Sequence, residues 1–330
     1  MGCLTYDYIT MELLNLKFPK EGVIECVGNT PLVRLGRMFT ESTVQLYGKL
    51  EMFNPGGSIK DRTALNIMKR ALEEGLIDSE TTIVESSSGN MGIGLARTCH
   101  YLGLKLILVT DPHINPLAEK ILKTFGAKVI KVTQDDGNGG YLNTRLTTVN
   151  TLLQQIPNSF WPDQYHNMDN PLAHEQTFLE VMDALKRPVD YFFISTSTCG
   201  TLRGFADAIK KYQVETKIVA VDAVGSVIFG NTPQPRLIPG MGASRKSNFL
   251  KPEQVHEVVH ISDSECIDGC RQLLARESIL AGGSSGAIVK AVEKKLSGIP
   301  HGAVVVALIA DNGERYLDTI YSDEWVLAHL

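Results

Sequence analysis

Short apolar stretches alternate with longer helical patterns along most of this 330-residue chain, and this alternation limits its fold more than any other feature. The apolar stretches at 81–86, 105–110, 128–132, 190–196, 217–223 and 303–311 indicate strands. Helical patterns at 90–104, 116–127 and 201–212 lie between them. Nearly continuous apolar strands separated by helices of about 10–15 residues are typical of parallel sheets with helices on both faces. The sequence therefore predicts an α/β fold with doubly wound sheets.

The predicted strands fall into two groups, on either side of a segment near 155–170 that is rich in proline, asparagine and aromatic residues. We expect that segment to be irregular. At about 100–200 residues per domain, the length fits two domains. We predict a smaller N-terminal domain over 1–160 and a larger C-terminal domain over 161–330. Open α/β sheets bind ligands beyond the carboxyl ends of their strands, so a ligand cleft is expected between the domains.

Composition excludes several classes of protein. The net charge is −5 and no basic block is present, so nucleic acid is not an expected partner. No apolar run reaches about 18 residues, which argues against a membrane span. The N-terminal stretch has neither the basic start nor the apolar core of a signal peptide, and we expect the cytoplasm.

No metal site is expected from the cysteines or histidines. The cysteines are scattered, which favours reduced thiols over disulfides; they are Cys3, Cys26, Cys99, Cys199, Cys266 and Cys270. Cys266 and Cys270 would share one helix face, but no further ligand pair completes a set of four. His256 and His260 occur in a stretch with strand character instead of a zinc-binding helix.

A lysine stands where "NPGGSIKDR" at 54–62 passes from a glycine turn into a predicted helix. Ser58 is expected to cap this helix, with Asp61 as its partner in a capping box. Lys60 then falls in the first helical turn, where the helix dipole is positive and a cation costs about 0.3–1 kcal/mol. A solvated surface lysine is one interpretation. The other is a neutral amine that attacks a carbonyl group, because burial and positive potential lower the pKa of a lysine.

Three further turns precede helices and are rich in hydroxyl groups and glycine. "ESSSGN" at 85–90 and "STSTCGT" at 195–201 each offer backbone N–H groups to an anion, and "GGSSGA" at 282–287 opens a late helix. Each alone is also explained by an ordinary helix cap. The glycine order of a dinucleotide or P-loop site is absent. Together with Lys60, these turns match the needs of a phosphorylated aldehyde cofactor and an amino-acid carboxylate.

With these motifs in this order, the sequence resembles the fold-type II pyridoxal-phosphate enzymes of the cysteine synthase and cystathionine β-synthase group. The resemblance covers nearly the whole chain; its motifs are "VGNTPLVRL", "NPGGSIKDR", "SSSGNMG", "DQYHNMDNPLAHE", "STCGT" and "GGSSGA". It implies the tryptophan synthase β-like architecture, with the cofactor in the cleft between two doubly wound domains. It also implies a larger domain that binds the cofactor, part of 20–45 crossing into that domain, and a homodimer.

The resemblance assigns roles to individual residues. Lys60 would carry pyridoxal 5'-phosphate as an internal aldimine and act as the catalytic base, while Asn90 would bind the ring oxygen. The cofactor phosphate is expected at Ser197, Thr198, Cys199, Gly200 and Thr201. The substrate carboxylate is expected at Ser86, Ser87, Ser88, Gly89 and Gln164. Cys199 replaces a glycine of the family, and a positive φ there would cost about 1–2 kcal/mol.

Ser284 matches the family residue that faces the pyridine nitrogen. A neutral hydroxyl group at that place does not hold a proton on the ring as a carboxylate would. The ring is then a weaker electron sink, which favours prompt loss of a β-substituent. The resemblance therefore implies β-elimination and β-replacement and disfavours transamination.

Four segments depart from ordinary cysteine synthases, at 139–145, 222–230, 240–245 and 316–325. They resemble the branch of siderophore and antibiotic biosynthesis that makes the precursor of 2,3-diaminopropionate. In that branch the family reaction joins O-phospho-L-serine to L-glutamate through an aminoacrylate intermediate. The products are N-(2-amino-2-carboxyethyl)-L-glutamate and phosphate.

A phosphorylated substrate needs a cation beyond those that serve the cofactor. Arg145 lies on a predicted helix from which it can point into the cleft and bind phosphate through two N–H groups, although a solvated helix arginine also fits. Tyr165 and Ser197 are the expected second contacts. Arg236 and Arg245 are weaker candidates for such a contact, and a place at the surface or in an interface explains them better.

Three alternatives remain open. A cysteine synthase would use the same residues with sulfide and either O-acetylserine or O-phosphoserine. A serine or threonine dehydratase would release a keto acid without a second substrate. A non-catalytic relative would bind a partner protein through its cleft.

Overall fold

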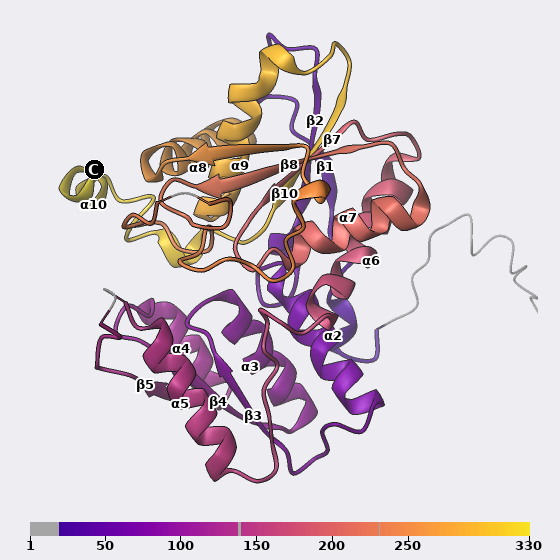
Figure 1. Ribbon diagram of the computed structural model, residues 1–330. Coiled ribbons are helices and arrows are strands. Elements are labelled where there is room, and N and C mark those ends of the chain that lie inside the picture. The colour runs from indigo at the N-terminus through magenta and orange to yellow at the C-terminus, as the bar shows by residue number, and fades with distance from the viewer. Residues whose placement is uncertain (1–19, 138–139, 231) are drawn as a thin grey trace, which may run out of the picture.

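The computed structural model describes residues 20–137, 140–230 and 232–330, and these form two lobes (Figure 1). Cys3, Gly139 and the N-terminal stretch considered above lie outside the described residues. Each lobe is built around one sheet, and both sheets are predominantly parallel. The predicted α/β fold is therefore confirmed.

The larger sheet has six strands in the order β1-β2-β10-β7-β8-β9, and only the β1–β2 pair is antiparallel. Its strands are β1 (Leu32–Arg34), β2 (Gln45–Leu50), β7 (Tyr191–Ser195), β8 (Lys217–Ala223), β9 (Glu257–Ile261) and β10 (Val304–Ile309). Every residue of β10 is buried, as expected for a continuous apolar strand with neighbours on both sides. Strands from the two ends of the chain thus lie side by side in this sheet.

The smaller sheet has four parallel strands in the order β5-β4-β3-β6. Its strands are β3 (Thr82–Ser86), β4 (Lys105–Thr110), β5 (Lys128–Lys131) and β6 (Ser159–Phe160). The first 50 residues contribute no strand to it in the part of the chain that is described. The domain boundary proposed near residue 160 stays a prediction.

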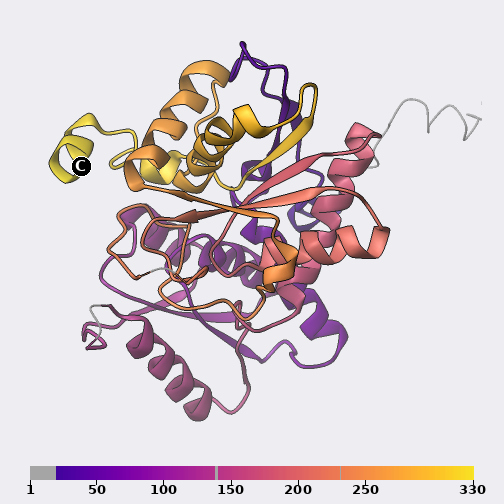
Figure 2. The ribbon, with the colours of Figure 1, turned by 45° about the horizontal axis from the view of Figure 1, so that its top comes forward.

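Helices cover the two sheets as Figures 1 and 2 show. Around the smaller sheet lie α2 (Lys60–Glu73), α3 (Asn90–Leu102), α4 (Pro116–Thr124) and α5 (Leu142–Gln155). Around the larger sheet lie α6 (Asp169–Leu185), α7 (Gly200–Tyr212), α8 (Asp263–Glu277) and α9 (Gly283–Lys295), with α10 (Asp323–His329) beyond them. Short 3-10 helices are η1 (Val23–Cys26), η2 (Glu51–Phe53), η3 (Pro252–Gln254), η4 (Leu296–Gly298) and η5 (Glu314–Tyr316). None of the helices in the described ranges is long and apolar enough to cross a bilayer.

Alternate residues of the smaller sheet pack on opposite faces. Ile83 and Leu106 join a core cluster with α2, α3 and α4, whereas Val84 and Ile107 join a second cluster with Val149 of α5. Because successive strand residues point to opposite faces, both faces of this sheet are covered by helices. This is the doubly wound arrangement that the sequence predicts.

A buried cluster of charged side chains fixes the helix that carries Lys60. Arg62 of α2 contacts Glu51 of η2 at 2.7 Å and Glu180 of α6 at 2.7 Å. Lys49 of β2 contacts Glu180 at 2.6 Å. Breaking a buried ion pair leaves a charge without a partner, which is strongly destabilising. The side chains of this cluster are therefore held in fixed positions. The cluster ties α2 to both β2 and α6.

The predicted capping box at the start of α2 is wrong. The helix begins at Lys60, and the Ser58 hydroxyl accepts from the backbone N–H of Lys60 at 3.2 Å. The Asp61 carboxylate accepts a hydrogen bond from the N–H of Gly56 in the preceding turn. The Asp61 carboxylate is therefore bound to the turn at Gly56 and does not form the capping box with Ser58. A capping box does form at Ser262 and Glu265, at the start of α8.

Candidate active site

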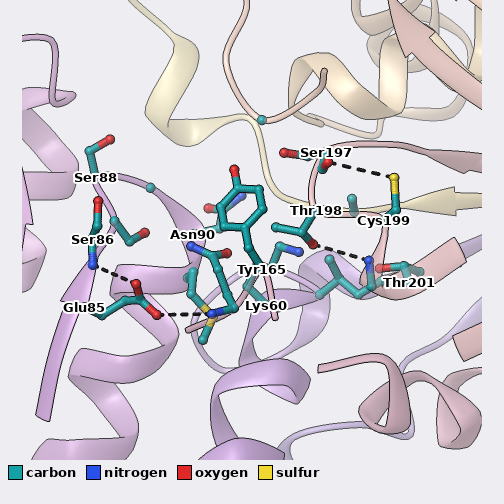
Figure 3. Close-up of a pocket in the computed structure, with 18 of the residues that line it drawn as sticks. Lys60, Glu85, Ser86, Ser88, Asn90, Tyr165, Ser197, Thr198, Cys199 and Thr201 are labelled. Carbon is teal, nitrogen blue, oxygen red and sulfur yellow. Dashed lines mark hydrogen bonds between the residues drawn. The ribbon is translucent and has the colours of Figure 1, made fainter. Parts of the chain in front are cut away.

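A cavity of about 260 Å³ lies between the two lobes, where turns follow the carboxyl ends of β3, β7 and β10. Every site residue that the sequence predicts lines it: Lys60, Ser86, Ser87, Ser88, Gly89, Asn90, Arg145, Gln164, Tyr165, Ser197, Thr198, Cys199, Gly200, Thr201 and Ser284. Figure 3 shows the turn at 86–90 and the turn at 197–201 on opposite sides of Lys60 and Tyr165. Their convergence agrees with ligand binding beyond the strand ends.

Lys60 stands in the wall of this cavity as the first residue of α2. Desolvation lowers the pKa of its amine to about 8. The backbone just before it is tied to the larger sheet, because Ile59 N–H donates to Ala310 O at 2.8 Å. Lys60 is therefore placed with the end of β10, and its amine loses its proton far more easily than that of an exposed lysine.

The turn after β3 presents hydroxyl groups and backbone N–H groups at the start of α3. The Ser86 hydroxyl is buried and has no partner among the described residues. The Ser87 hydroxyl accepts from Gly92 N–H at 3.0 Å and so is used within the helix start. Backbone N–H groups at a helix N-terminus favour an anion, and an unpaired buried hydroxyl costs free energy until a ligand satisfies it. This turn is suited to a carboxylate.

Glu85 directly precedes that turn, and no pattern in the sequence marks it as a site residue. Its carboxyl group accepts from Trp161 Nε1 at 3.1 Å, Ser86 N at 2.7 Å and Gln164 N at 3.4 Å. Desolvation raises its pKa to about 7, against these hydrogen bonds. Glu85 therefore joins the 86–90 turn to the segment that carries Gln164 and Tyr165.

The turn after β7 opens α7, which begins at Gly200. Cys199 precedes it with φ of 64°, in the left-handed region, as the family glycine at this place would require. A Cβ atom at Gly200 would come within 2.3 Å of Asn170 Oδ1, so this position needs glycine. The Ser247 hydroxyl donates to Thr198 O at 2.5 Å and supports the turn from outside. The result is a second anion-binding helix start opposite the first.

Asn90 is held by residues near the C-terminus. Its Nδ2 donates to Asp311 Oδ2 at 2.9 Å, and Tyr316 Oη donates to the same oxygen at 2.8 Å. Arg315 Nη2 donates to Asn90 Oδ1 at 2.5 Å. These contacts fix which end of the Asn90 amide is the donor, and none of them is visible in the local sequence.

Ser284 lies near the start of α9 and is buried. It lines the cavity, whereas the neighbouring Ser285 hydroxyl accepts from Ala310 N–H at 3.0 Å. Ser284 and Ser285 are therefore distinct in position. Only Ser284 faces the space between the lobes.

Two arginines line the cavity from different lobes. Arg145 of α5 contacts Asp111 at 3.1 Å, and its Nε is buried without a partner among the described residues. The Cζ of Arg245 lies 3.7 Å from the centroid of the Tyr165 ring. Arg245, the weaker candidate in the sequence, is half-buried and forms part of the cavity wall. Arg236 does not line the cavity and donates to Ser244 Oγ at 3.1 Å.

Comparisons with known proteins agree on one family. The sequence profile of the family described as "Pyridoxal-phosphate dependent enzyme" matches residues 23–311. A curated relative, N-(2-amino-2-carboxyethyl)-L-glutamate synthase of Ralstonia nicotianae, is 44% identical over 307 residues, which cover 93% of this chain and 91% of that one.

Solved structures give the same result. The O-acetylserine-dependent cystathionine β-synthase of Helicobacter pylori is 29% identical with a TM-score of 0.85, over 93% of this chain and 100% of that one. An O-ureido-L-serine synthase is 30% identical with a TM-score of 0.85, over 94% and 100% of the two chains. The predicted resemblance to the cysteine synthase and cystathionine β-synthase group is thereby confirmed.

Proposed function

Because this chain belongs to the pyridoxal-phosphate-dependent enzymes and uses that cofactor, we propose that it joins O-phospho-L-serine to L-glutamate. The products are N-(2-amino-2-carboxyethyl)-L-glutamate and phosphate. The observation that carries the proposal is the 44% identity to the Ralstonia synthase over 93% of this chain. Arg145 in the cavity wall supplies the cation that a phosphorylated substrate needs.

The cavity fits pyridoxal phosphate. Lys60 offers an amine whose pKa is lowered to about 8, which suits bond formation with an aldehyde. The turn at 197–201 offers backbone N–H groups and three hydroxyl side chains to the cofactor phosphate. Asn90, fixed by Arg315 and Asp311, would hold the ring oxygen. Ser284 would face the ring nitrogen with a neutral hydroxyl group.

The turn at 86–89 and Gln164 would hold the carboxylate of phosphoserine. The Ser86 hydroxyl, buried without a partner among the described residues, is available for one carboxylate oxygen. Gln164 is tied to the same turn through Glu85, so both contacts move as one unit. Held there, the substrate would present the bond between Cα and its proton to the amine of Lys60, a placement that accelerates proton transfer.

Arg145 would bind the leaving phosphate, with Tyr165 and Ser197 as further contacts. A planar guanidinium offers two parallel N–H groups to a phosphate, and the buried Nε of Arg145 is free among the described residues. Asp111 holds the guanidinium at 3.1 Å before substrate arrives. The cation stabilises the negative charge that grows on the phosphate oxygen as its bond to Cβ breaks.

Pyridoxal phosphate, when bound, supplies an electron sink for the pair of electrons left at Cα. Once the substrate amine has displaced it from the cofactor, Lys60 Nζ would take the Cα proton as general base. The phosphate group would depart from Cβ with the electrons of that bond, and the glutamate amine would then bond to Cβ. Lys60 Nζ returns a proton to Cα, and the glutamate nitrogen loses one. Closing of the smaller lobe over the cavity would exclude water, which otherwise diverts the substrate to pyruvate and ammonia.

The same proposal extends to the biological setting. The product is a precursor of 2,3-diaminopropionate in siderophore or antibiotic biosynthesis. We expect a homodimer in the cytoplasm, with only small molecules as substrates. These points follow from the family resemblance of the sequence.

The decisive experiment is mass spectrometry of the products after holoenzyme is mixed with phosphoserine and glutamate. A coupled adduct and an equal amount of phosphate support the proposal. An adduct only when sulfide replaces glutamate identifies a cysteine synthase instead. Pyruvate released at the same rate with and without glutamate identifies a dehydratase, and no conversion at all favours the partner-binding alternative.

A further inference from the structure

The second cavity arginine, Arg245, has no role in the mechanism above. It belongs to the connection between β8 and β9, at the end of "GMGASR" at 240–245. Its side chain is partly buried in the cavity wall, and its Cζ lies 3.7 Å from the centre of the Tyr165 ring. Figure 3 places that ring between the 86–90 and 197–201 turns, above Lys60. Arg245 is therefore held beside the reacting centre from the larger lobe.

The contact with Tyr165 leaves the donors of Arg245 available. A guanidinium stacked on an aromatic ring uses one face, while its N–H groups point outward in the plane. Within the described residues, no carboxylate contacts Arg245, whereas Arg145 is paired with Asp111 at 3.1 Å. An unpaired guanidinium in a partly buried wall is a strong site for a carboxylate, which binds two parallel N–H groups.

The charges of the two substrates decide which carboxylate this is. The basic side chains of the described cavity wall are Lys60, Arg145 and Arg245. Lys60 serves the cofactor, the 86–89 turn serves the donor carboxylate, and Arg145 serves the leaving phosphate. Glutamate brings an α-carboxylate and a side-chain carboxylate, and none of these groups is assigned to bind either. Arg145 becomes available for one of them once phosphate has left, and Arg245 is then the cation that remains for the other. Burying that charge without a partner would be costly.

We propose that Arg245, braced by Tyr165, binds the side-chain carboxylate of the incoming amino acid and so selects an acidic acceptor. This inference rests on the proposed function. Arg245 acts on the second substrate only, after phosphate has been released. Tyr165 would then have two tasks, since its hydroxyl group is a proposed contact of the leaving phosphate while its ring positions the guanidinium.

The test compares wild-type holoenzyme with Arg245→Gln and with Arg245→Lys. Two quantities are measured: the concentration dependence of the spectral change on adding phosphoserine alone, and kcat and KM for L-glutamate and for L-glutamine. Glutamine has nearly the same shape as glutamate but lacks its side-chain charge. Loss of a charge-assisted, two-donor contact should raise the KM for glutamate roughly ten- to hundredfold in Arg245→Gln. The preference for glutamate over glutamine should fall by a similar factor, and Arg245→Lys should lie between.

Arg187→Gln is the matched control. Arg187 also lies over a tyrosine ring, that of Tyr47 at 5.6 Å, but it does not line the cavity. Arg187→Gln should leave the KM for glutamate and the preference for glutamate over glutamine unchanged. If Arg187→Gln changed them as Arg245→Gln does, the inference would be overturned, because the effect would then follow from the loss of any arginine. The phosphoserine response should stay within about twofold in every variant.

Two results would overturn the inference while leaving the proposed function intact. In one, Arg245→Gln makes the adduct with an unchanged preference for glutamate over glutamine. In the other, it weakens the response to phosphoserine alone, which would place Arg245 at the leaving phosphate. If wild-type enzyme forms no adduct from phosphoserine and glutamate, the proposed function fails and the inference fails with it.

Discussion

Arg315 donates from Nη2 to Oδ1 of Asn90 at 2.5 Å, although the two residues are 225 positions apart in sequence. Asn90 opens α3 beside the smaller sheet, whereas Arg315 follows β10 of the larger one. The contact therefore crosses between the lobes at the cavity. It sets the direction of the amide that would hold the cofactor ring.

Replacement of Arg315 by glutamine should destabilise the protein strongly. Arg315 lies 3.8 Å from Asp311, and the side chains of both are almost fully buried. Removing one partner of a buried pair leaves the other charge uncompensated, at a cost of about 3 kcal/mol or more. Thermal unfolding and cofactor titration should show a lower Tm and weaker cofactor binding. Lys69→Gln, which removes an exposed ion pair with Glu73, should cost less than about 1 kcal/mol; equal losses in the two variants would contradict the prediction.

Cofactor uptake should depend on the protonation of Lys60. Only the neutral amine attacks the aldehyde, and desolvation lowers the pKa of Lys60 from 10.5 to about 8. The uptake rate of the cofactor-free chain should rise with pH and level off above about 8. Because the folded pKa lies below the unfolded one, burial of Lys60 also costs stability below pH 8, and that cost fades as pH rises toward 10.5. Visible absorbance after mixing at a series of pH values measures the rate, and a rise that continues to about pH 10 would exclude the lowered pKa.

Glu85→Gln should become relatively more stable as pH rises. The pKa of Glu85 is raised from 4.5 to about 7, so the folded state holds the proton more tightly than the unfolded state. Its stabilising contribution is complete below 4.5 and is lost as pH rises to 7. The free energy of unfolding of Glu85→Gln, minus that of wild type, should increase by roughly 3 kcal/mol across this window. Urea unfolding of both proteins at several pH values tests this, and a pH-independent difference would refute it.

Cys199 tests the cost of a left-handed backbone. Its φ of 64° is readily adopted by glycine but is strained for a residue with a Cβ atom. Cys199→Gly relieves that strain but also removes a side chain buried against Phe249 and Ile228, so its net change is small. Comparison with Cys199→Ala isolates the backbone effect, and the glycine variant should be more stable than the alanine variant by about 1 kcal/mol. Urea unfolding measures it, and an alanine variant at least as stable as the glycine variant would count against the strain.

Local patterns in the sequence predicted the strands and helices well. The apolar stretches at 105–110 and 217–223 form β4 and β8, and both strands have the predicted bounds. Such strands are buried on both faces, so their apolar runs are unbroken and easy to recognise. The strands β1, β2 and β6 were not predicted, because they are short or carry mixed residues and their pairing depends on distant partners.

The site was predictable where a motif concentrates its chemistry in one turn. Lys60 and the serine turn at 86–88 were found in this way, and the structure brings them together. Glu85, Asp311 and Arg315 were missed, because their importance depends on contacts with residues distant in sequence. Arg245 was only a weaker candidate, because it lies in an irregular connection where no periodicity indicates which side chains face inward.

The order of strands in the larger sheet has a consequence for synthesis on the ribosome. β10, at Val304–Ile309, lies between β2 and β7 and is hydrogen-bonded to both. The segment Leu32–Leu50 therefore has no partner in the rest of the sheet until Val304–Ile309 has been made. The smaller sheet, by contrast, draws on one continuous stretch from Thr82 to Phe160. We expect the smaller lobe to fold first, whereas β1 and β2 can join the larger sheet only after β10 has left the ribosome.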